Sequence, residues 1–237
     1  MRINIVLLVL PAISMVVWPA CKKKTSAGTS MCQIITVTDQ EGASTTTIKL
    51  TYDGQGRVST KQLIRGSDTI LLVFTYSGNT EIVQTSGPGL AISDSMTLNS
   101  YGQAESDYES DGTNTYVTIN TYSGDELQTS IYNYGSGPDT TTNSWTNGDL
   151  TSSTTRGVTT TYSYNSKASE EGDYFWLVQG INFGGDLIRT AHQLISSQNP
   201  SGVLTVNYTY DGTGKITEVA YTSGSISGTD AYQYSCR

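Results

Sequence analysis

The sequence has few of the residues that build metal sites or charged interfaces. Among 237 residues it has one histidine, three cysteines and five prolines, and only 14% of its residues are charged. A single histidine argues against a histidine-rich metal site. Low charge, few prolines and the absence of a strict glycine repeat exclude a coiled coil and a collagen-like chain. A hydrophobic fraction of 36% excludes a multi-pass helical membrane protein.

The charge that is present is mostly negative. Four of the 13 basic residues, Arg2 and Lys22–Lys24, lie near the N-terminus, so nine basic residues face 21 acidic ones in the remainder. Such a negative field repels phosphate backbones, and we therefore expect no nucleic-acid partner. No glycine-rich phosphate loop follows a strand and opens a helix, so we also expect no cofactor.

The first residues are typical of a targeting segment. Arg2 precedes an apolar stretch over residues 3–17, and Ala20 supplies the small residue at which a secretory signal is cut. Cys21 resembles the acceptor cysteine of bacterial lipoproteins. We predict a lipoprotein signal peptide at 1–20, a lipidated tether at 21–31 and a single β-barrel-like domain at 32–237. The alternative is an uncleaved helical anchor.

The predicted location is the cell envelope, with a lipid anchor, at the outer membrane. Lys22–Lys24 can lie against anionic headgroups, which contribute roughly 1 kcal/mol for each lysine. Bacteroidetes-type lipoproteins exported to the surface usually carry acidic residues after the cysteine, so the lysines do not support surface display. The membrane side remains open.

Two cysteines flank the folded region. Cys32 opens it and Cys236 is the penultimate residue. In an oxidising compartment we predict a disulfide between them. Unpaired thiols, or a bridge to another chain, are the alternatives.

Turn residues recur along the chain at regular intervals. Asp53-Gly54-Gln55-Gly56 returns as Asp211-Gly212-Thr213-Gly214. An aromatic residue or a leucine stands before most of these turns, and the first five are spaced 24, 22, 24 and 23 residues apart: Tyr52, Tyr76, Leu98, Tyr122, Trp145, Tyr164 and Tyr210. A second class of turn falls midway, which indicates an internal repeat of hairpins.

The repeat predicts an all-β fold: an antiparallel up-and-down meander of about 16 short strands, forming a soluble barrel or a strongly curved sheet. A bridge from Cys32 to Cys236 would demand that the sheet nearly close. One short helix is expected at about 174–182, where apolar residues fall on a helical face behind Asp173 as N-cap. A membrane-spanning barrel is disfavoured, since the strands are short and one face is mostly Thr, Ser, Asn and Lys.

The units Tyr52-Asp53-Gly54-Gln55-Gly56 and Tyr210-Asp211-Gly212-Thr213-Gly214 resemble the tyrosine-aspartate repeat of many extracellular bacterial proteins. Together with Cys21-Lys22-Lys23-Lys24 and the late aromatic helix, the chain resembles a Bacteroidetes lipoprotein family of unknown function with a porin-like fold. The resemblance implies a soluble antiparallel barrel or curved sheet on a lipid anchor. It implies no catalytic residues.

Two groups of side chains are candidates for ligand contact. Five aromatic residues could form a platform for sugar rings if they stack on an outward face, or could instead fill the core: Tyr132, Tyr134, Trp145, Tyr162 and Tyr164. Asp107, Glu109 and Asp111 alternate on one strand face and could present oxygens to Ca²⁺, or could form an ordinary solvated acidic face. We predict no other metal site.

The function predicted from these features is a non-catalytic binding or structural role in the envelope, toward a glycan, an apolar small molecule or an envelope partner. One alternative is a glycan hydrolase with a carboxylate pair, either Glu105 and Asp107 or Glu170 and Asp173. Another is a purely structural interaction module. We assign no catalytic role to the single histidine, His192, because nothing in the sequence marks a partnered nucleophile.

Overall fold

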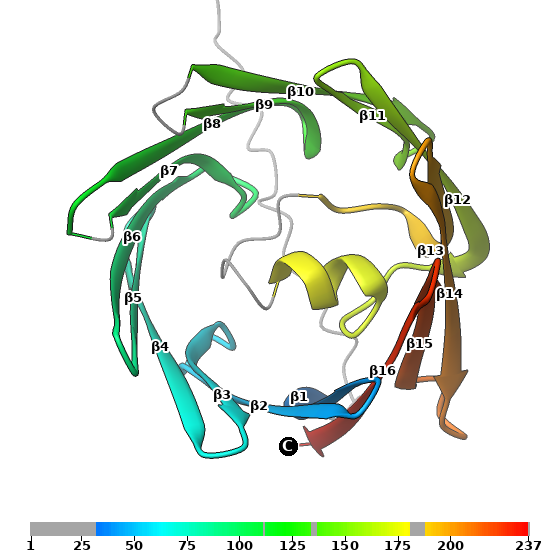
Figure 1. Ribbon diagram of the computed structural model, residues 1–237, viewed down its shortest axis with the longest axis horizontal. Coiled ribbons are helices and arrows are strands. Elements are labelled where there is room, and N and C mark those ends of the chain that lie inside the picture. Colours follow the sequence, from blue (N-terminus) through cyan, green and yellow to red (C-terminus); the bar gives the residue numbers. More distant parts are fainter. Residues whose placement is uncertain (1–31, 111, 134–136, 181–187, 237) are drawn as a thin grey trace, which may run out of the picture.

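A single antiparallel sheet closes into a barrel in the computed structural model, which describes residues 32–110, 112–133, 137–180 and 188–236 (Figure 1). Within these residues each of sixteen strands pairs with its neighbours in sequence, and β1 pairs with β16. The strands are β1 (Cys32–Glu41), β2 (Ser44–Tyr52), β3 (Val58–Arg65), β4 (Asp68–Ser77), β5 (Thr80–Gly87), β6 (Leu90–Leu98), β7 (Ala104–Ser110), β8 (Thr115–Ser123), β9 (Glu126–Asn133), β10 (Pro138–Thr146), β11 (Asp149–Thr155), β12 (Val158–Ala168), β13 (His192–Asn199), β14 (Gly202–Tyr210), β15 (Ile216–Ser223) and β16 (Ile226–Cys236). The predicted meander is confirmed, and the sheet is closed as well as curved.

The two faces of the sheet differ as strand alternation requires. On β2, Ile48 and Leu50 are buried inside the barrel, whereas Lys49 and Thr51 are exposed on its outer face. Threonines on neighbouring strands share hydrogen bonds across the outer face, as Thr51 does with Thr60 at 2.6 Å. Threonine suits these positions because a β-branched side chain packs well on a pleated, half-buried surface.

The disulfide joins the two ends of the meander. Cys32 and Cys236 are direct partners in the β1–β16 pairing, and their sulfur atoms are bonded. The pairing continues along the strands as far as Glu41 and Gly228. Closure therefore removes both sheet edges, which would otherwise expose unpaired backbone groups.

Three turns at the Cys32 end of the barrel share one local geometry. Oδ1 of Asp53 accepts hydrogen bonds from the backbone N–H groups of residues 55 and 57, and Oδ1 of Asp211 accepts them from residues 213 and 215. Asn99 does the same for residues 101 and 103. An Asp or Asn side chain that holds the backbone two and four residues onward favours this turn, which explains the aspartate of the tyrosine-aspartate repeat.

A segment between β12 and β13 enters the barrel, and we call the described parts of it, residues 169–180 and 188–191, the plug. It contains one turn of α-helix at Tyr174 and Phe175 that continues as the π-helix η1 (Trp176–Gly180). The short predicted helix is present, and positions 181 and 182 of its predicted range lie outside the described residues. Figure 1 shows η1 inside the ring and nearer to β13 and β16 than to β5 and β6. None of the helical structure in the described ranges is long and apolar enough to cross a membrane.

The core is divided because the plug occupies one side. The larger cluster includes Phe175 of the plug together with buried residues of β1, β2, β11 and β13–β16, among them Ile34, Leu194 and Val219. A smaller cluster of Phe74, Val83, Met96 and Ala104 lines β4–β7. The wall that faces the plug therefore carries the larger part of the apolar core.

Candidate functional site: the barrel interior

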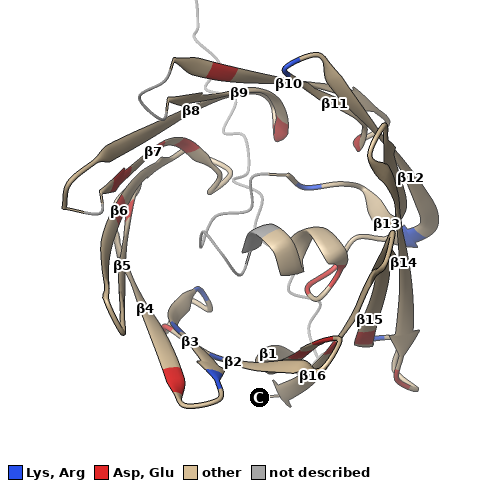
Figure 2. Ribbon diagram, in the orientation of Figure 1, with Lys and Arg blue, Asp and Glu red and all other residues tan. Residues whose placement is uncertain are grey.

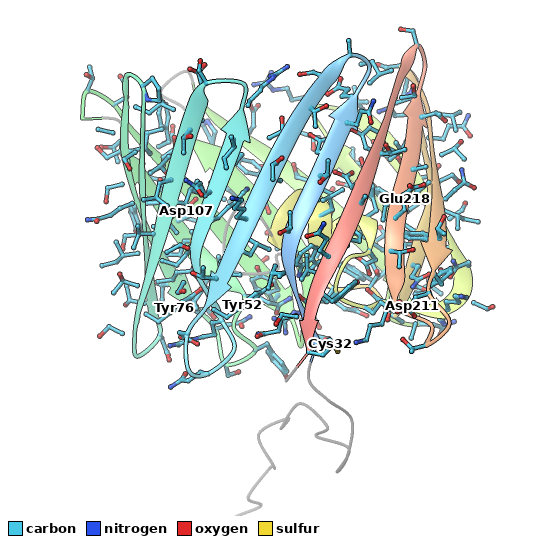
Figure 3. The ribbon with its side chains drawn as sticks, turned by 90° about the horizontal axis from the view of Figure 1, so that it is seen from below. Cys32, Tyr52, Tyr76, Asp107, Asp211 and Glu218 are labelled. Atoms are coloured by element: carbon cyan, nitrogen blue, oxygen red, sulfur yellow. A yellow bond between two sulfur atoms is a disulfide. The ribbon has the colours of Figure 1, made fainter. Side chains whose placement is uncertain are left out.

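A belt of aromatic hydrogen bonds lies at the Cys32 end of the barrel. In seven of the eight hairpins, as far as the structure describes them, an aromatic side chain near the end of the second strand donates to a backbone carbonyl at the start of the first strand, over 2.5 to 2.9 Å. The donors are Tyr52, Tyr76, Tyr122, Trp145, Tyr164, Tyr208 and Tyr234. Figure 3 shows Tyr52 and Tyr76 at the same end of the barrel as Cys32.

The belt explains why the repeat carries an aromatic residue with a polar atom. Six of the seven acceptors lie where the register with the preceding hairpin shifts, as Val58 does opposite Tyr52 and Leu127 does opposite Tyr122. At a bulge the carbonyl loses its regular ladder partner. A tyrosine hydroxyl or an indole N–H supplies a donor while its ring covers apolar surface, and at Ala104 and Leu127 an asparagine amide donates as well. Leu98 occupies the corresponding place in the β5–β6 hairpin, and its side chain cannot donate such a hydrogen bond.

The plug is fixed in place by its first residues. Asp173, which is 2% exposed, accepts hydrogen bonds from the Trp176 N–H at 2.9 Å and from the Ser169 hydroxyl. It therefore acts as the N-cap, as predicted from its place before the aromatic residues. Gly172 has a φ of 94°, and an added Cβ would lie 3.1 Å from Ile34 and 3.3 Å from Tyr232. Only glycine allows the backbone to approach the β1–β16 wall this closely.

The far side of the plug reaches across the barrel. The Arg189 guanidinium donates to the carbonyl of Tyr101, in the turn between β6 and β7, at 2.9 Å. On the near side, Trp176 meets Tyr232 edge-on, with ring centroids 6.2 Å apart. The plug is thus attached to both sides of the Cys32 end.

A cavity of about 340 Å³ lies beside the plug. Its lining contains three carboxylates, one guanidinium and two aromatic rings: Ser169, Glu170, Glu171, Asp173, Phe175, Trp176, Ile188, Arg189 and Thr190. The Glu171 carboxylate accepts from the Ile34 N–H at 3.1 Å and from the Tyr52 hydroxyl at 3.3 Å. Glu170 accepts from the Gln193 amide at 3.3 Å. The carboxylates of this cavity serve as hydrogen-bond acceptors that hold the plug to the barrel.

A second group of carboxylates lies on the inner wall opposite the plug, and we call it the acidic wall: Glu81 of β5, Asp94 of β6, and Asp107 and Glu109 of β7. Met96 pairs with both Glu81 and Asp107, and Asp94 pairs directly with Glu109. These side chains alternate with residues of the outer face, of which Ile82 and Tyr108 are exposed. Figure 2 shows acidic positions on β6 and β7, across the ring from η1.

Three carboxyl groups of the acidic wall, those of Glu81, Asp94 and Asp107, hold their protons more strongly than usual. Burial raises the pKa of Glu81 to about 8, with Asp107 raising it further and Arg57 opposing the shift. Burial also raises the pKa of Asp94 to about 7, with contributions from Asp107 and Glu109, and that of Asp107 to about 6. Each shift has the same cause: the charged form loses solvation and faces other carboxylates.

A third group of carboxylates, a pair, lies where β1 and β16 meet. Asp39 of β1 and Asp230 of β16 are direct partners on the inner face. Asp230 is 2% exposed, and burial with the neighbouring Asp39 raises its pKa to about 7. Burial and Glu41 likewise raise the pKa of Asp39. Two like charges directly opposite each other destabilise a sheet, so this pair favours a protonated member.

The structure separates the aromatic residues predicted as a platform. Trp145 and Tyr164 belong to the belt, and Tyr162 packs against Phe175 of the plug, with ring centroids 6.1 Å apart. Tyr132 lies toward the other end of the barrel, beside Asp139 and the Arg156 that pairs with it. Tyr134 lies outside the described residues. The four described rings all lie on the inner side of the sheet, at different heights.

The other predicted site residues are placed as follows. Asp107 and Glu109 share the inner face of β7 as expected, Asp111 lies outside the described residues, and the described residues contain no group of three ligands arranged for a metal ion. Glu105 is exposed and has no partner in the β6–β7 pairing because the register shifts at this point. Glu105 and Asp107 therefore do not lie side by side on one face of the strand. The ring of His192 bonds to Asp149 at 2.7 Å.

Sequence reasoning missed Glu81 and Asp94. Both belong to strands whose alternation was readable, since Glu81 and Val83 share a face, as do Asp94 and Met96. A carboxylate on the apolar side of a predicted strand was the available signal, because burying one is costly.

These observations define a class: a closed sixteen-stranded antiparallel barrel with an internal plug at one end. No protein-family model matches the chain, and no curated protein matches it. Among solved structures the chain is similar to a porin-like protein from Bacteroides uniformis ATCC 8492, with a TM-score of 0.62 and 14% identity over 85% of this chain and 96% of that one. It is also similar to a porin-like protein from Bacteroides vulgatus ATCC 8482, with a TM-score of 0.56 and 13% identity over 85% and 98%. The porin-like fold predicted by resemblance is confirmed; the lipid anchor and the membership of a repeat family stay predictions.

Proposed function

We propose that this chain is a non-catalytic binding protein of the cell envelope, and that its ligand enters the barrel from the end opposite Cys32. One observation carries the proposal: the plug packs against one side of the interior, while inward-facing polar residues of the other side remain partly exposed. Asp94, Asp107, Thr118 and Tyr132 are all of this kind. A concave site with a few convergent polar groups is the usual form of a small-molecule site.

The proposed anchor determines how the barrel would be oriented relative to the membrane. Cys32 starts β1 at the plugged end, so a lipid on Cys21 would attach the domain by that end. Eleven residues of tether reach on the order of 35 Å when extended. The unplugged end would then face away from the membrane, which suits the capture of a ligand from the surrounding medium.

The outer face supports a barrel that stands in water. Outward positions are rich in Thr and Ser, and they include the charged residues Lys49 and Glu218. Exposed apolar residues such as Ile119 and Val73 are interspersed among them. Lipid-facing strands instead need an apolar band flanked by aromatic girdles, and here the aromatic belt faces inward.

A non-catalytic role is supported by how the carboxylates are used. Glycoside hydrolysis needs one carboxylic acid and one carboxylate free to reach the substrate. Asp173 uses both of its oxygens to cap the plug, and Glu170 accepts from Gln193. This pair is committed to holding the plug.

The binding role is tested by thermal shift of the full-length protein in detergent with three probes: spermidine, maltotriose and laurate. Thr118→Trp would fill the interior, because Thr118 pairs with Asp107 on the inner face. Thr142→Trp makes the same exchange at an exposed outer position. We expect at least one probe to raise the melting temperature of the wild type and of Thr142→Trp but not of Thr118→Trp. No shift with any probe, or equal shifts in both variants, would overturn the proposal.

The anchor is tested separately. Cells that express the chain would be labelled with an alkyne analogue of palmitate, with Cys21→Ser as the control. Label on the wild type that is lost in Cys21→Ser supports the anchor, and an unlabelled wild type would refute it.

A further inference from the structure

We propose that the acidic wall is a binding site for small aliphatic polyamines, with Glu81, Asp94, Asp107 and Glu109 as the groups that receive ammonium ions. The inference rests on the proposed function, because the ligand must enter the barrel to reach this wall. It adds the chemical class of the ligand and the residues that recognise it.

The carboxylates form a continuous track from the plugged end toward the open end. Glu81 stands near the start of β5, Asp94 and Asp107 lie in the middle of their strands, and Glu109 lies near the end of β7. Exposure follows the same order: Glu81 is fully buried, and Asp94, Asp107 and Glu109 are partly exposed. A ligand that enters from the open end would meet Glu109 first and Glu81 last. Figure 3 shows Asp107 at mid-height, well above the belt.

The burial of Glu81 without a hydrogen-bond partner is the observation that points to a ligand. Its side chain is 0% exposed, and neither carboxyl oxygen has a hydrogen-bond partner in the described part of the chain. Oδ1 of Asp94 and Oδ1 of Asp107 are likewise buried without a partner. Buried polar atoms in native proteins nearly always have partners, because an unpaired one costs free energy. Four such oxygens on three adjacent strands are complementary to a multivalent donor.

The spacing favours an organic cation over a metal ion. Neighbouring strands lie roughly 5 Å apart, so Glu81 and Asp107, two strands apart, are separated by roughly 10 Å. Apolar side chains lie between the carboxylates: Met96 separates Glu81 from Asp107, and Val83 pairs with Asp94. A metal ion needs several oxygens within 2.6 Å of one point. An aliphatic chain with ammonium groups several bonds apart fits alternating carboxylates and methylene-sized apolar contacts.

The positively charged side chains near the acidic wall do not form hydrogen bonds with the Glu81 carboxyl group. Arg57 faces Glu81 from the β3 side, but its guanidinium pairs with Asp53 at 2.7 Å and lies 4.0 Å above the Tyr76 ring. Lys61 faces inward on β3, two strands from β5, and burial lowers its pKa to about 8. Neither cation offers a hydrogen bond to the Glu81 oxygens.

Protonation should be linked to binding. Near neutral pH the wall holds protons, since the pKa of Glu81 is raised to about 8, that of Asp94 to about 7 and that of Asp107 to about 6. A polyamine favours the ionised carboxylates and therefore displaces these protons. Binding should release protons at pH 7, and affinity should increase between pH 6 and pH 8.

The test is isothermal titration of spermidine into the full-length protein in detergent, at pH 6, 7 and 8 and in two buffers of different ionisation enthalpy. Three variants neutralise the wall with little change of shape: Glu81→Gln, Asp94→Asn and Asp107→Asn. Glu218→Gln removes an acidic side chain from the outer face and serves as the matched control. We expect each wall variant to weaken spermidine binding at least tenfold and to reduce proton release, with Glu218→Gln unchanged. Melting curves check that each variant is folded; Glu81→Gln should melt no lower than the wild type, because it removes a buried carboxyl.

Each outcome decides the proposal. Spermidine binding that all three wall variants leave intact, or that Glu218→Gln weakens equally, would overturn the site. Binding of Ca²⁺ that is tighter than that of spermidine and lost in the same variants would assign the wall to a metal ion instead. If maltotriose or laurate binds the wild type but not Thr118→Trp, and spermidine does not bind, the polyamine site is refuted and the proposed binding function is retained. If no probe binds, both fail.

Discussion

Replacement of both bridged cysteines by serine should lower the stability of the barrel substantially. The Cys32–Cys236 bond closes a loop of 204 residues. In the chain-entropy model such a bond restricts the unfolded chain and stabilises the folded state by about 5 kcal/mol. The folded state should lose little else, because the β1–β16 pairing extends to Glu41 and does not need the bond. For a domain of this size, 5 kcal/mol corresponds to a decrease of roughly 10–20 °C in Tm.

The assay compares wild type, the Cys32→Ser/Cys236→Ser variant and reduced wild type by thermal and urea unfolding, followed by far-UV circular dichroism. We expect the reduced wild type and the variant to agree. We also expect a steeper urea dependence for both, because an unfolded chain without the cross-link exposes more surface. A variant that melts within about 2 °C of the wild type would refute the reasoning, since it would mean that closure of the sheet alone holds the ends together.

Three further predictions follow from single side chains. Tyr164→Phe should cost about 1–2 kcal/mol in urea unfolding, because it removes the side-chain donor that bonds the Leu150 carbonyl at a register shift. Tyr108→Phe, at a side chain that is 49% exposed, should change stability by less than about 0.5 kcal/mol. Equal effects would exclude the belt as a stabilising feature. Gly172→Ala should cost about 1–3 kcal/mol through its positive φ and close contacts, with Gly212→Ala, where a Cβ meets nothing within 4 Å, as the neutral control. Asp230→Asn should remove part of the pH dependence of the free energy of unfolding. Because the pKa of Asp230 is raised to about 7, the wild type loses stability as pH rises from about 4 to about 7, so the variant should become more stable relative to the wild type across that window and show a constant difference above it. Parallel stability profiles of the two proteins would contradict the buried acidic pair.

The hairpin repeat made most of the fold predictable. Regular turns, an aromatic residue or a leucine before most turns of one class, and short alternating strands were enough for about sixteen strands, and a bridge from Cys32 to Cys236 pointed to closure. The late aromatic helix was also readable, because Asp173 precedes residues with helical spacing. The predicted aromatic platform shows the limit: alternation places two residues on one face but does not say which face is the inside. Trp145 and Tyr164 reach the carbonyls of Leu127 and Leu150, which a sequence does not reveal as bulge positions.

The sequence alone determined the local elements, because turn chemistry, strand propensity and helix capping act between residues a few positions apart. Closure of the sheet, the place of the plug and the gathering of Glu81, Asp94 and Asp107 were decided by the tertiary structure. These features depend on the register of strands that pair across the whole barrel. A shift of one residue in that register would turn every inward side chain outward, and only the folded sheet determines which carboxylates meet inside it.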